Sequence, residues 1–129
     1  MMSVASTKPE TQMEMALIER GIQYEKQVAS MPGKPDFYVP ASRLVIFVHG
    51  CYWHRHMCRA QLDKGRKLDV FRQMTWNFAV ERDIRTRQKL QALGYSIFVA
   101  WECDLANSKT TVGKLVESYI KGRSGDTFI

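Results

Sequence analysis

The sequence predicts an α/β fold in which a mixed central sheet is flanked by helices. Two apolar runs, residues 43–48 (RLVIFV) and 95–101 (YSIFVAW), have the length and composition of buried strands. Periodic apolar stretches before, between and after these runs predict helices. The resulting order is α-β-β-β-α-β-α without an internal repeat, which is typical of a sheet covered by helices.

The first helix is expected to begin just after a small, polar N-terminal segment. Thr7 followed by Glu10 matches a capping box, and Pro9 stands in the first turn. Gly21 is expected to end this helix. Its predicted apolar face consists of Met13, Leu17 and Ile18.

Three consecutive strands are predicted after the first helix. Residues 22–28 alternate loosely between apolar and polar side chains, and residues 30–35 (SMPGKP) read as a turn. Residues 36–39 (DFYV) then predict a short strand, and residues 43–48 predict a central one.

Two further helices are predicted around the last strand. A long helical pattern runs from about Leu68 to Leu93, before Gly94, and Ser108 is suited to cap a final amphipathic helix. The expected core positions of the long helix are Phe71, Met74, Phe78, Ile84 and Leu90. Those of the final helix are Val112, Leu115, Val116, Tyr119 and Ile120.

The length of 129 residues fits a single domain. We expect a flexible arm at residues 1–8, the domain at residues 9–121 and a tail at residues 122–129. No apolar run is long enough to span a bilayer and no signal peptide is recognisable, so the prediction is a cytoplasmic protein with no membrane partner. The net charge of +6 and the pI near 9.4 suggest a polyanionic partner such as nucleic acid.

Residues 49–58 (HGCYWHRHMC) contain all three histidines and two of the three cysteines. Zinc favours four ligands drawn from thiolate and imidazole groups. A structural zinc site is therefore predicted at Cys51, His56, Cys58 and Cys103, the last of which directly follows the strand at residues 95–101. The alternative is that the cysteines are small buried apolar residues, and their fit to one four-ligand set favours zinc.

A second metal site is suggested by Pro35 and Asp36, which resemble the first half of the PD-(D/E)xK nuclease pattern. The second half is missing, so one carboxylate would hold the metal with backbone oxygen and water, as suits Mg²⁺. Phosphodiester hydrolysis also requires groups that orient water and stabilise the leaving oxygen. Asp36, His49 and His54 can supply this chemistry, although each is also compatible with a purely structural role.

The chain resembles the very-short-patch repair (Vsr) endonucleases over roughly residues 9–105. The motifs that carry the resemblance are PGKPDF, HGCYWHRHxC, VERD and WEC. It implies a fold related to type II restriction endonucleases, one structural zinc, and Mg²⁺-dependent nicking of DNA on the 5′ side of the thymine in a T:G mismatch. Such mismatches arise when 5-methylcytosine is deaminated. The expected partner is double-stranded, mismatched DNA, bound by a monomer, and any mismatch-repair protein partners are unknown.

The resemblance also implies roles for individual residues. Asp36 would be the principal Mg²⁺ ligand with the backbone of Val48 nearby, and His49 would lie in the metal–water shell. His54 would act as general acid or base, supported by Asp83. Glu10 matches an acidic position of the family, and its role in the capping box is an equally weighted alternative.

The aromatic pair Tyr52 and Trp53 matches residues that wedge into the base stack beside the mismatch. A wedge offsets the cost of unstacking, which is lowest at a mismatched step. The alternative is that Trp53 belongs to the core of its own loop. Basic residues expected to contact DNA phosphates are Lys64, Arg66, Lys67 and Arg72.

The chain departs from the family pattern in several places, and residues 61–78 (QLDKGRKLDVFRQMTWNF) are otherwise divergent. Its N-terminal segment is short, Val48 stands where threonine is usual, and Ala79 stands where asparagine is common. Two alternative functions follow. One is a homing endonuclease of the related Vsr-like group, which would cut unmismatched sites, and the other is a zinc-stabilised DNA-binding module without catalysis.

Overall fold

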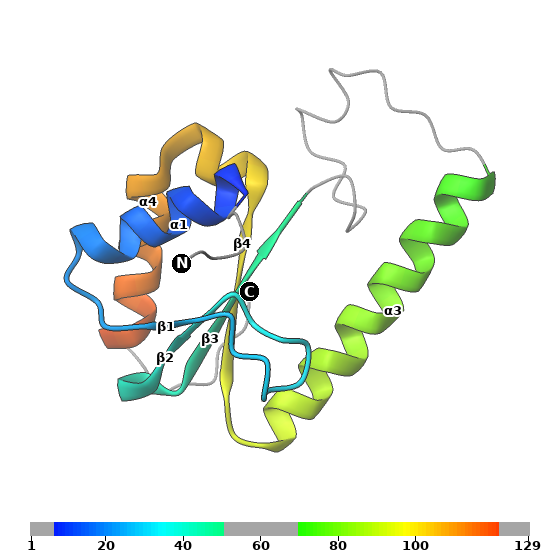
Figure 1. The fold of residues 1–129 in the computed structure, drawn as a ribbon, viewed down its shortest axis with the longest axis horizontal. Helices are drawn as coiled ribbons and strands as arrows, with labels where there is room; N and C mark the ends of the chain where they lie inside the picture. Colours follow the sequence, from blue (N-terminus) through cyan, green and yellow to red (C-terminus); the bar gives the residue numbers. More distant parts are fainter. Residues whose placement is uncertain (1–6, 51–69, 122–129) are drawn as a thin grey trace.

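The computed structural model describes residues 7–50 and 70–121 (Figure 1). The strands are β1 (Glu25–Lys26), β2 (Phe37–Val39), β3 (Leu44–His49) and β4 (Ser96–Trp101). The helices are α1 (Lys8–Glu19), α3 (Val70–Ala92) and α4 (Glu102–Lys121), with a short 3-10 turn at Pro40–Ser42. The predicted order of elements and the mixed sheet are confirmed. Among these described helices, none combines the length and hydropathy needed to cross a membrane.

The four strands form one sheet in the order β1-β2-β3-β4. The first three are antiparallel neighbours, whereas β3 and β4 run parallel, in register from Leu44 and Ser96 to His49 and Trp101. A parallel pair requires a crossover connection, and α3 supplies its helix. The carboxyl ends of β3 and β4 therefore meet at the same edge of the sheet.

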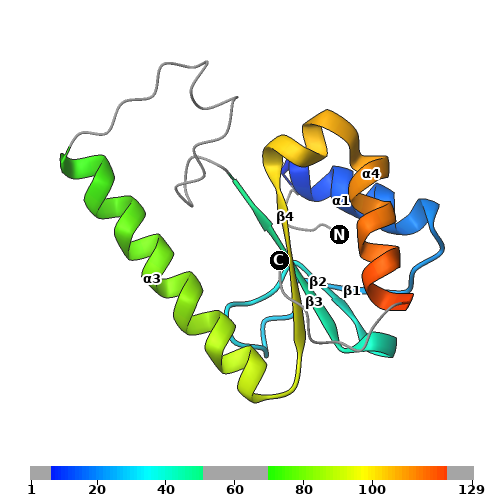
Figure 2. The ribbon, with the colours of Figure 1, turned by 180° about the vertical axis from the view of Figure 1, so that it is seen from behind.

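The sheet is covered on both faces, by α1 and α4 on one side and by α3 on the other (Figures 1 and 2). Alternate side chains of β3 and β4 point to opposite faces, which explains why both strands are almost entirely apolar. Leu44, Ile46, Phe98 and Ala100 belong to the core cluster under α1 and α4. The cluster on the α3 side consists of Val45, Phe47, Leu90, Ile97 and Val99.

Helix α1 begins and ends as predicted. The Thr7 N–H donates to Oε1 of Glu10 at 3.1 Å and the Glu10 N–H donates to Oγ1 of Thr7 at 3.4 Å, so both halves of the capping box form. Gly21, with φ +67°, stands just beyond the helix. The expectation that Ile18 is buried is wrong, because its side chain is 60% exposed. The buried face is Met13, Ala16 and Leu17, since α1 packs closely on α4 where Ala16 meets Gly113.

Helix α3 differs most from its prediction. Leu90 is fully buried, but Phe78 is 66% exposed and Ile84 is 51% exposed, so these two predicted core positions are wrong. The helix diverges from the sheet towards its N-terminal end, and only its C-terminal part packs on the strands (Figure 1). Phe78 and Ile84 therefore have no sheet to cover. The side chains of Phe71 and Met74 lie outside the described residues, as does Leu68.

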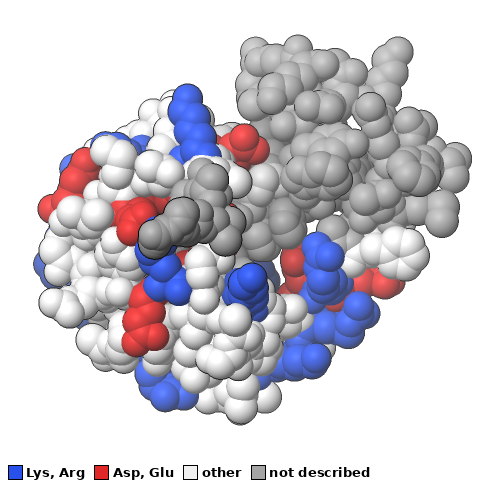
Figure 3. Space-filling view, in the orientation of Figure 1, with Lys and Arg blue, Asp and Glu red and all other residues white. Residues whose placement is uncertain are grey.

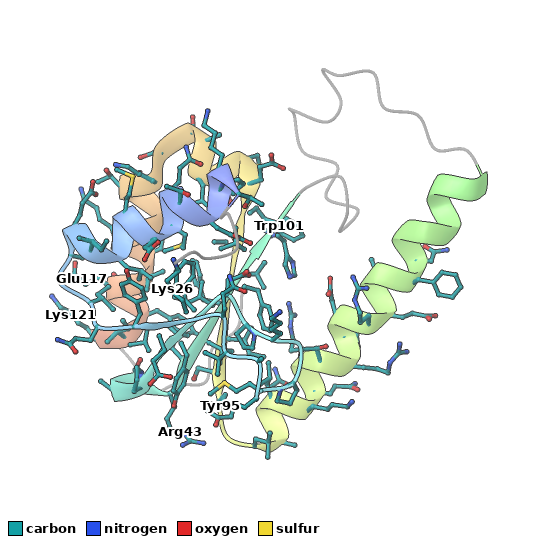
Figure 4. The ribbon with its side chains drawn as sticks, in the orientation of Figure 1. Lys26, Arg43, Tyr95, Trp101, Glu117 and Lys121 are labelled. Atoms are coloured by element: carbon teal, nitrogen blue, oxygen red, sulfur yellow. The ribbon has the colours of Figure 1, made fainter. Side chains whose placement is uncertain are left out.

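Arg43 fixes the end of α3 beside the sheet. Its guanidinium donates to the carbonyl oxygens of Leu93 at 2.9 Å and Gly94 at 3.4 Å, which follow the last turn of α3. It also lies 4.5 Å from the ring centroid of Tyr95, a cation–π contact that Figure 4 shows at the base of β4. This contact anchors the connection through which α3 is held against β4.

Helix α4 begins earlier than expected. Helical backbone starts at Glu102, directly after β4, and Ser108 interrupts it with φ −165° and ψ 99°. The Thr111 N–H donates to Oγ of Ser108 at 3.1 Å, so Ser108 caps the following turns as predicted. Among the predicted core positions of α4, Val112 and Val116 are buried and Leu115 is 54% exposed, which makes the last expectation wrong. Tyr119 and Ile120 are partly buried against the core.

Candidate active site

Asp36 lies at the start of β2, where the ladder between β2 and β3 ends. The last Cα pair of that ladder is Phe37 with Ile46, so the next N–H of β3 that faces β2 belongs to Val48. This N–H donates to Oδ2 of Asp36 at 2.8 Å. The backbone carbonyl oxygen of Asp36 is in turn held by the N–H of Gln27 at 2.9 Å. The carboxylate is thus fixed by the backbone of its neighbours.

The pKa of Asp36 is raised from 3.8 to about 6. Burial is the largest cause, because a desolvated carboxylate favours its neutral form. The Val48 hydrogen bond acts in the opposite direction, and the negative charge of Glu10 raises the pKa further. Glu10 therefore completes the cap of α1 and also lies close enough to Asp36 to act on it. The capping role that the sequence predicts for Glu10 is therefore compatible with a position beside Asp36.

A cavity of about 280 Å³ opens beside Asp36, between α3 and the sheet. Four residues predicted for the catalytic site line it together: Asp36, Val48, His49 and Asp83. Asp36 directly precedes β2, Val48 and His49 belong to β3, and Asp83 reaches the cavity from α3. In Figure 3 acidic and basic side chains meet in the hollow between α3 and the body of the molecule. The fold therefore brings together residues that are far apart in the sequence.

His49 is oriented by aromatic neighbours at the end of β3. Its ring lies edge-on to Trp101, with centroids 5.2 Å apart at an interplanar angle of 74°, and tilted to Phe47 at 5.8 Å. Trp101 is labelled at the corresponding end of β4 in Figure 4. Because His49 and Trp101 are paired in the β3–β4 register, the Trp101 ring packs beside the imidazole. The His49 side chain remains partly exposed and lines the cavity.

Three basic residues for which the sequence predicted no role also line the cavity: Lys34, Arg82 and Arg87. Lys34 precedes Asp36 by two positions in the predicted turn. Arg87 stands four positions after Asp83, which places both on one face of a helix. This helical spacing is the signal that could have identified Arg87 once Asp83 was assigned to the site.

Many predicted functional residues lie outside the described part of the chain. They are His54, the zinc ligands Cys51, His56 and Cys58, the aromatic pair Tyr52 and Trp53, the basic residues Lys64, Arg66 and Lys67, and the side chain of Arg72. The fourth predicted zinc ligand, Cys103, is described and lies partly buried in the first turn of α4. Within residues 7–50 and 70–121, no three His, Cys, Asp or Glu side chains are grouped to hold a metal ion.

Comparison with known proteins identifies relatives of this chain. The family model of the DNA mismatch endonuclease Vsr matches residues 1–60. The type II nicking enzyme V.XorIIP of Xanthomonas oryzae is 38% identical, over 79% of this chain and 74% of its own length. V.NmeAIP, a type II nicking enzyme of Neisseria meningitidis, is 34% identical over 78% and 71%. The DNA mismatch endonuclease Vsr of Escherichia coli is 37% identical over 77% of this chain, which spans 63% of that protein's length.

A solved structure shares the fold. The catalytic domain of the homing endonuclease I-Bth0305I superposes with a TM-score of 0.58 and 22% identity, over 88% of this chain and 93% of that domain. At this identity the likeness concerns the fold, and it agrees with a nuclease-like arrangement of sheet and helices. Together with the relatives at 34% to 38% identity, these findings show that the chain belongs to the Vsr family and is a DNA endonuclease.

Proposed function

We propose that this endonuclease nicks one strand of duplex DNA on the 5′ side of the thymine in a T:G mismatch, in a reaction that depends on Mg²⁺. The single observation that carries the proposal is the cavity in which Asp36, Val48, His49 and Asp83 converge, with Glu10 beside Asp36. The names of the relatives support nicking and action at a mismatch, since two are nicking enzymes and one is a mismatch endonuclease. Very short patch repair of deaminated 5-methylcytosine would be the biological setting.

The residues around Asp36 suit a hard divalent cation. Asp36 offers a carboxylate held in place by Val48, and the carboxylate of Glu10 adds a second negative charge. Oxygen donors of this kind are preferred by Mg²⁺, and nucleases of this family are generally dependent on divalent metals. Without a cation, burial and like-charge repulsion both disfavour ionised Asp36. When bound there, Mg²⁺ would supply charge stabilisation at the phosphoryl group and lower the pKa of water.

The protein's own groups would position the reactants. His49, whose ring contacts Phe47 and Trp101, lines the cavity and would orient a water molecule by hydrogen bonding. His54 is proposed as general acid or base, because an imidazole can exchange a proton near neutral pH. Asp83 would support His54 by accepting a hydrogen bond from its ring, and its place on the cavity wall suits that role.

A structural zinc site at Cys51, His56, Cys58 and Cys103 remains part of the proposal. The register of the parallel strands supports it, since His49 pairs with Trp101. Cys51 follows His49 by two residues and Cys103 follows Trp101 by two, so the chain approaches both cysteines from the same sheet edge. Three thiolates and one imidazole would form a tetrahedral zinc site that stabilises the intervening loop.

DNA recognition is proposed to use the segment that follows β3. Tyr52 and Trp53 would insert beside the mismatch, where unstacking costs least. Lys64, Arg66, Lys67 and Arg72 would contact phosphates and contribute affinity independent of sequence. The Mg²⁺ site and the wedge would then act on neighbouring positions of one strand.

The test uses two duplexes that differ only in one base, one with a T:G mismatch and one with a T:A pair, each labelled on both strands. With Mg²⁺, we expect a nick in the thymine strand of the T:G duplex and none in an Asp36→Ala control. Equal cleavage of both duplexes at a preferred site would instead favour the homing-type alternative. Duplex binding without any nick would favour the non-catalytic module.

A further inference from the structure

The cavity carries positive charge that the proposed chemistry leaves unused. Lys34 lines it from the turn before β2 and Arg87 from α3, and Arg82 is an exposed lining residue. Elsewhere on the described surface several cations are paired, as Arg20 is with Glu117 at 3.0 Å. Within the described residues, no ion pair or side-chain hydrogen bond is recorded for Lys34 or Arg87. These two cations therefore remain available to a ligand in the cavity.

The position of Lys34 is determined by the turn that precedes β2. Gly33 and Lys34 both adopt left-handed backbone, with φ +76° and +50°, and the Lys34 N–H donates to the carbonyl oxygen of Met31 at 3.0 Å. A Cβ on Gly33 would stand 2.3 Å from Cγ2 of Thr86 and 3.3 Å from the Phe47 ring. The turn is thus pressed against both α3 and β3. A left-handed lysine is costly, and such conformations persist where the surroundings impose them, often at binding sites.

The position of Arg87 follows from the same contact. It is adjacent to Thr86, the α3 residue on which the Gly33 turn rests, and its side chain is partly buried beside the cavity. A planar guanidinium offers several N–H donors in a fixed fork that matches the oxygen atoms of a phosphate. The ammonium of Lys34 adds a compact positive charge from the turn before β2.

We propose that Lys34 and Arg87 form a cationic seat for one phosphodiester group of the DNA backbone, in the cavity that they line together with Asp36. The seat rests on the proposed function in taking DNA as the ligand. A phosphate that approaches Asp36 and Glu10 is repelled by their charges, and two cations that line the same cavity oppose that repulsion. Figure 3 shows basic side chains bordering the hollow that also contains acidic ones.

The test measures binding rather than cleavage. A fluorescein-labelled 20-base-pair duplex is titrated with protein, without added Mg²⁺, across a series of NaCl concentrations. We expect Lys34→Gln and Arg87→Gln each to weaken binding by roughly tenfold at about 0.1 M salt, and to lower the slope of log Kd against log salt by about 0.9. Lys34→Arg and Arg87→Lys keep the charge and are expected to retain the wild-type slope.

Two matched variants serve as controls. Arg85→Gln removes an exposed cation of α3 that does not line the cavity, and Lys114→Gln removes one from α4 on the other face of the sheet. Both are expected to leave the slope unchanged, and thermal unfolding verifies that every variant is folded. The seat is refuted if Lys34→Gln and Arg87→Gln bind like wild type, or if Arg85→Gln causes an equal loss.

The binding test separates the seat from the nicking activity. If wild type does not nick the T:G duplex but the two Gln variants still lose slope, the proposed reaction fails and the seat stands. If wild type nicks the duplex and the variants keep the slope, the seat fails and the proposed reaction stands.

Discussion

The backbone N–H of Val48 donates a 2.8 Å hydrogen bond to Oδ2 of Asp36, at the point where the β2–β3 ladder ends. The side chain of Asp36 thereby takes the place of a main-chain acceptor. Because the donor is backbone, the bond does not depend on the side chain at position 48. The same bond directs the carboxylate to the cavity shared with His49 and Asp83.

Replacing Asp36 by asparagine should stabilise the Mg²⁺-free protein at neutral pH. The pKa of Asp36 is raised from 3.8 to about 6, so the folded state holds its proton more strongly than the unfolded state does. Its contribution to stability is therefore present below pH 4 and is lost as the pH rises through 6. A shift of about two units corresponds to roughly 3 kcal/mol, which partial solvent exposure reduces to about 1–2 kcal/mol.

Urea unfolding at pH 5 and pH 7.5 measures this effect in wild type and Asp36→Asn. The gain in unfolding free energy on substitution should be larger at pH 7.5, because the wild-type carboxylate is then ionised. An equal gain at both pH values would contradict the assigned pKa. Asparagine keeps an acceptor oxygen for the Val48 N–H, which isolates the effect of charge.

The two roles of Glu10 can be separated by substitution. Glu10→Gln keeps a side chain that a capping box accepts but removes the charge beside Asp36, so we expect a change in stability below about 0.5 kcal/mol. The Mg²⁺ concentration for half-maximal nicking should rise by roughly tenfold, because the loss of a group that supports a metal ligand typically weakens metal binding by at least that factor. Thr7→Ala is the matched control, which should cost about 1 kcal/mol of stability and leave the Mg²⁺ requirement unchanged. The dual assignment fails if Glu10→Gln leaves the Mg²⁺ requirement at the wild-type value.

Gly33→Ala should destabilise the protein by at least about 2 kcal/mol, because its Cβ would collide with Thr86 at 2.3 Å and its φ is +76°. Gly21→Ala has a similar φ of +67° but no atom within 4 Å, so it should cost only about 1 kcal/mol. Thermal and urea unfolding compare the two. Thr86→Ser removes the colliding methyl group and should recover part of the Gly33→Ala loss, whereas equal costs at both glycines would show that the turn is not pressed on α3.

Local signals in the sequence predicted the elements well. The capping box of Thr7 and Glu10 and the apolar runs of β3 and β4 are determined by neighbouring residues, and the structure confirms them. The core positions of α3 could not be predicted, since Phe78 and Ile84 would be buried only if the helix lay flat along the sheet. Its divergence from the sheet is a tertiary property that periodicity does not contain.

The site shows the same division between local and tertiary information. Asp36, His49 and Asp83 were predicted from motifs, and the structure places them around one cavity. No role was predicted for Lys34, which lies in the PGKPDF motif, or for Arg87, because their common place at the cavity depends on the contact between Gly33 and Thr86. Such contacts between distant segments are formed by packing and are invisible in the sequence of either segment.

The histidines after β3 should divide into two functional classes. His56→Ala is expected to lose zinc and stability, because it removes one of four ligands. His54→Ala is expected to keep zinc and folding but to lose nicking. Zinc content by elemental analysis, together with thermal unfolding, tests the division, and equal zinc loss in both variants would overturn it.

The most direct measurement compares nicking of the T:G duplex by wild type and by Asp36→Asn, in saturating Mg²⁺ and with both proteins shown to be folded. In metal-assisted hydrolysis the metal and its ligands stabilise the transition state by several kcal/mol. Asp36→Asn should therefore nick at least about a thousandfold more slowly than wild type. A variant that nicks the thymine strand within about tenfold of the wild-type rate, a difference of about 1.4 kcal/mol, would show that the cavity at Asp36 is not the site of cleavage.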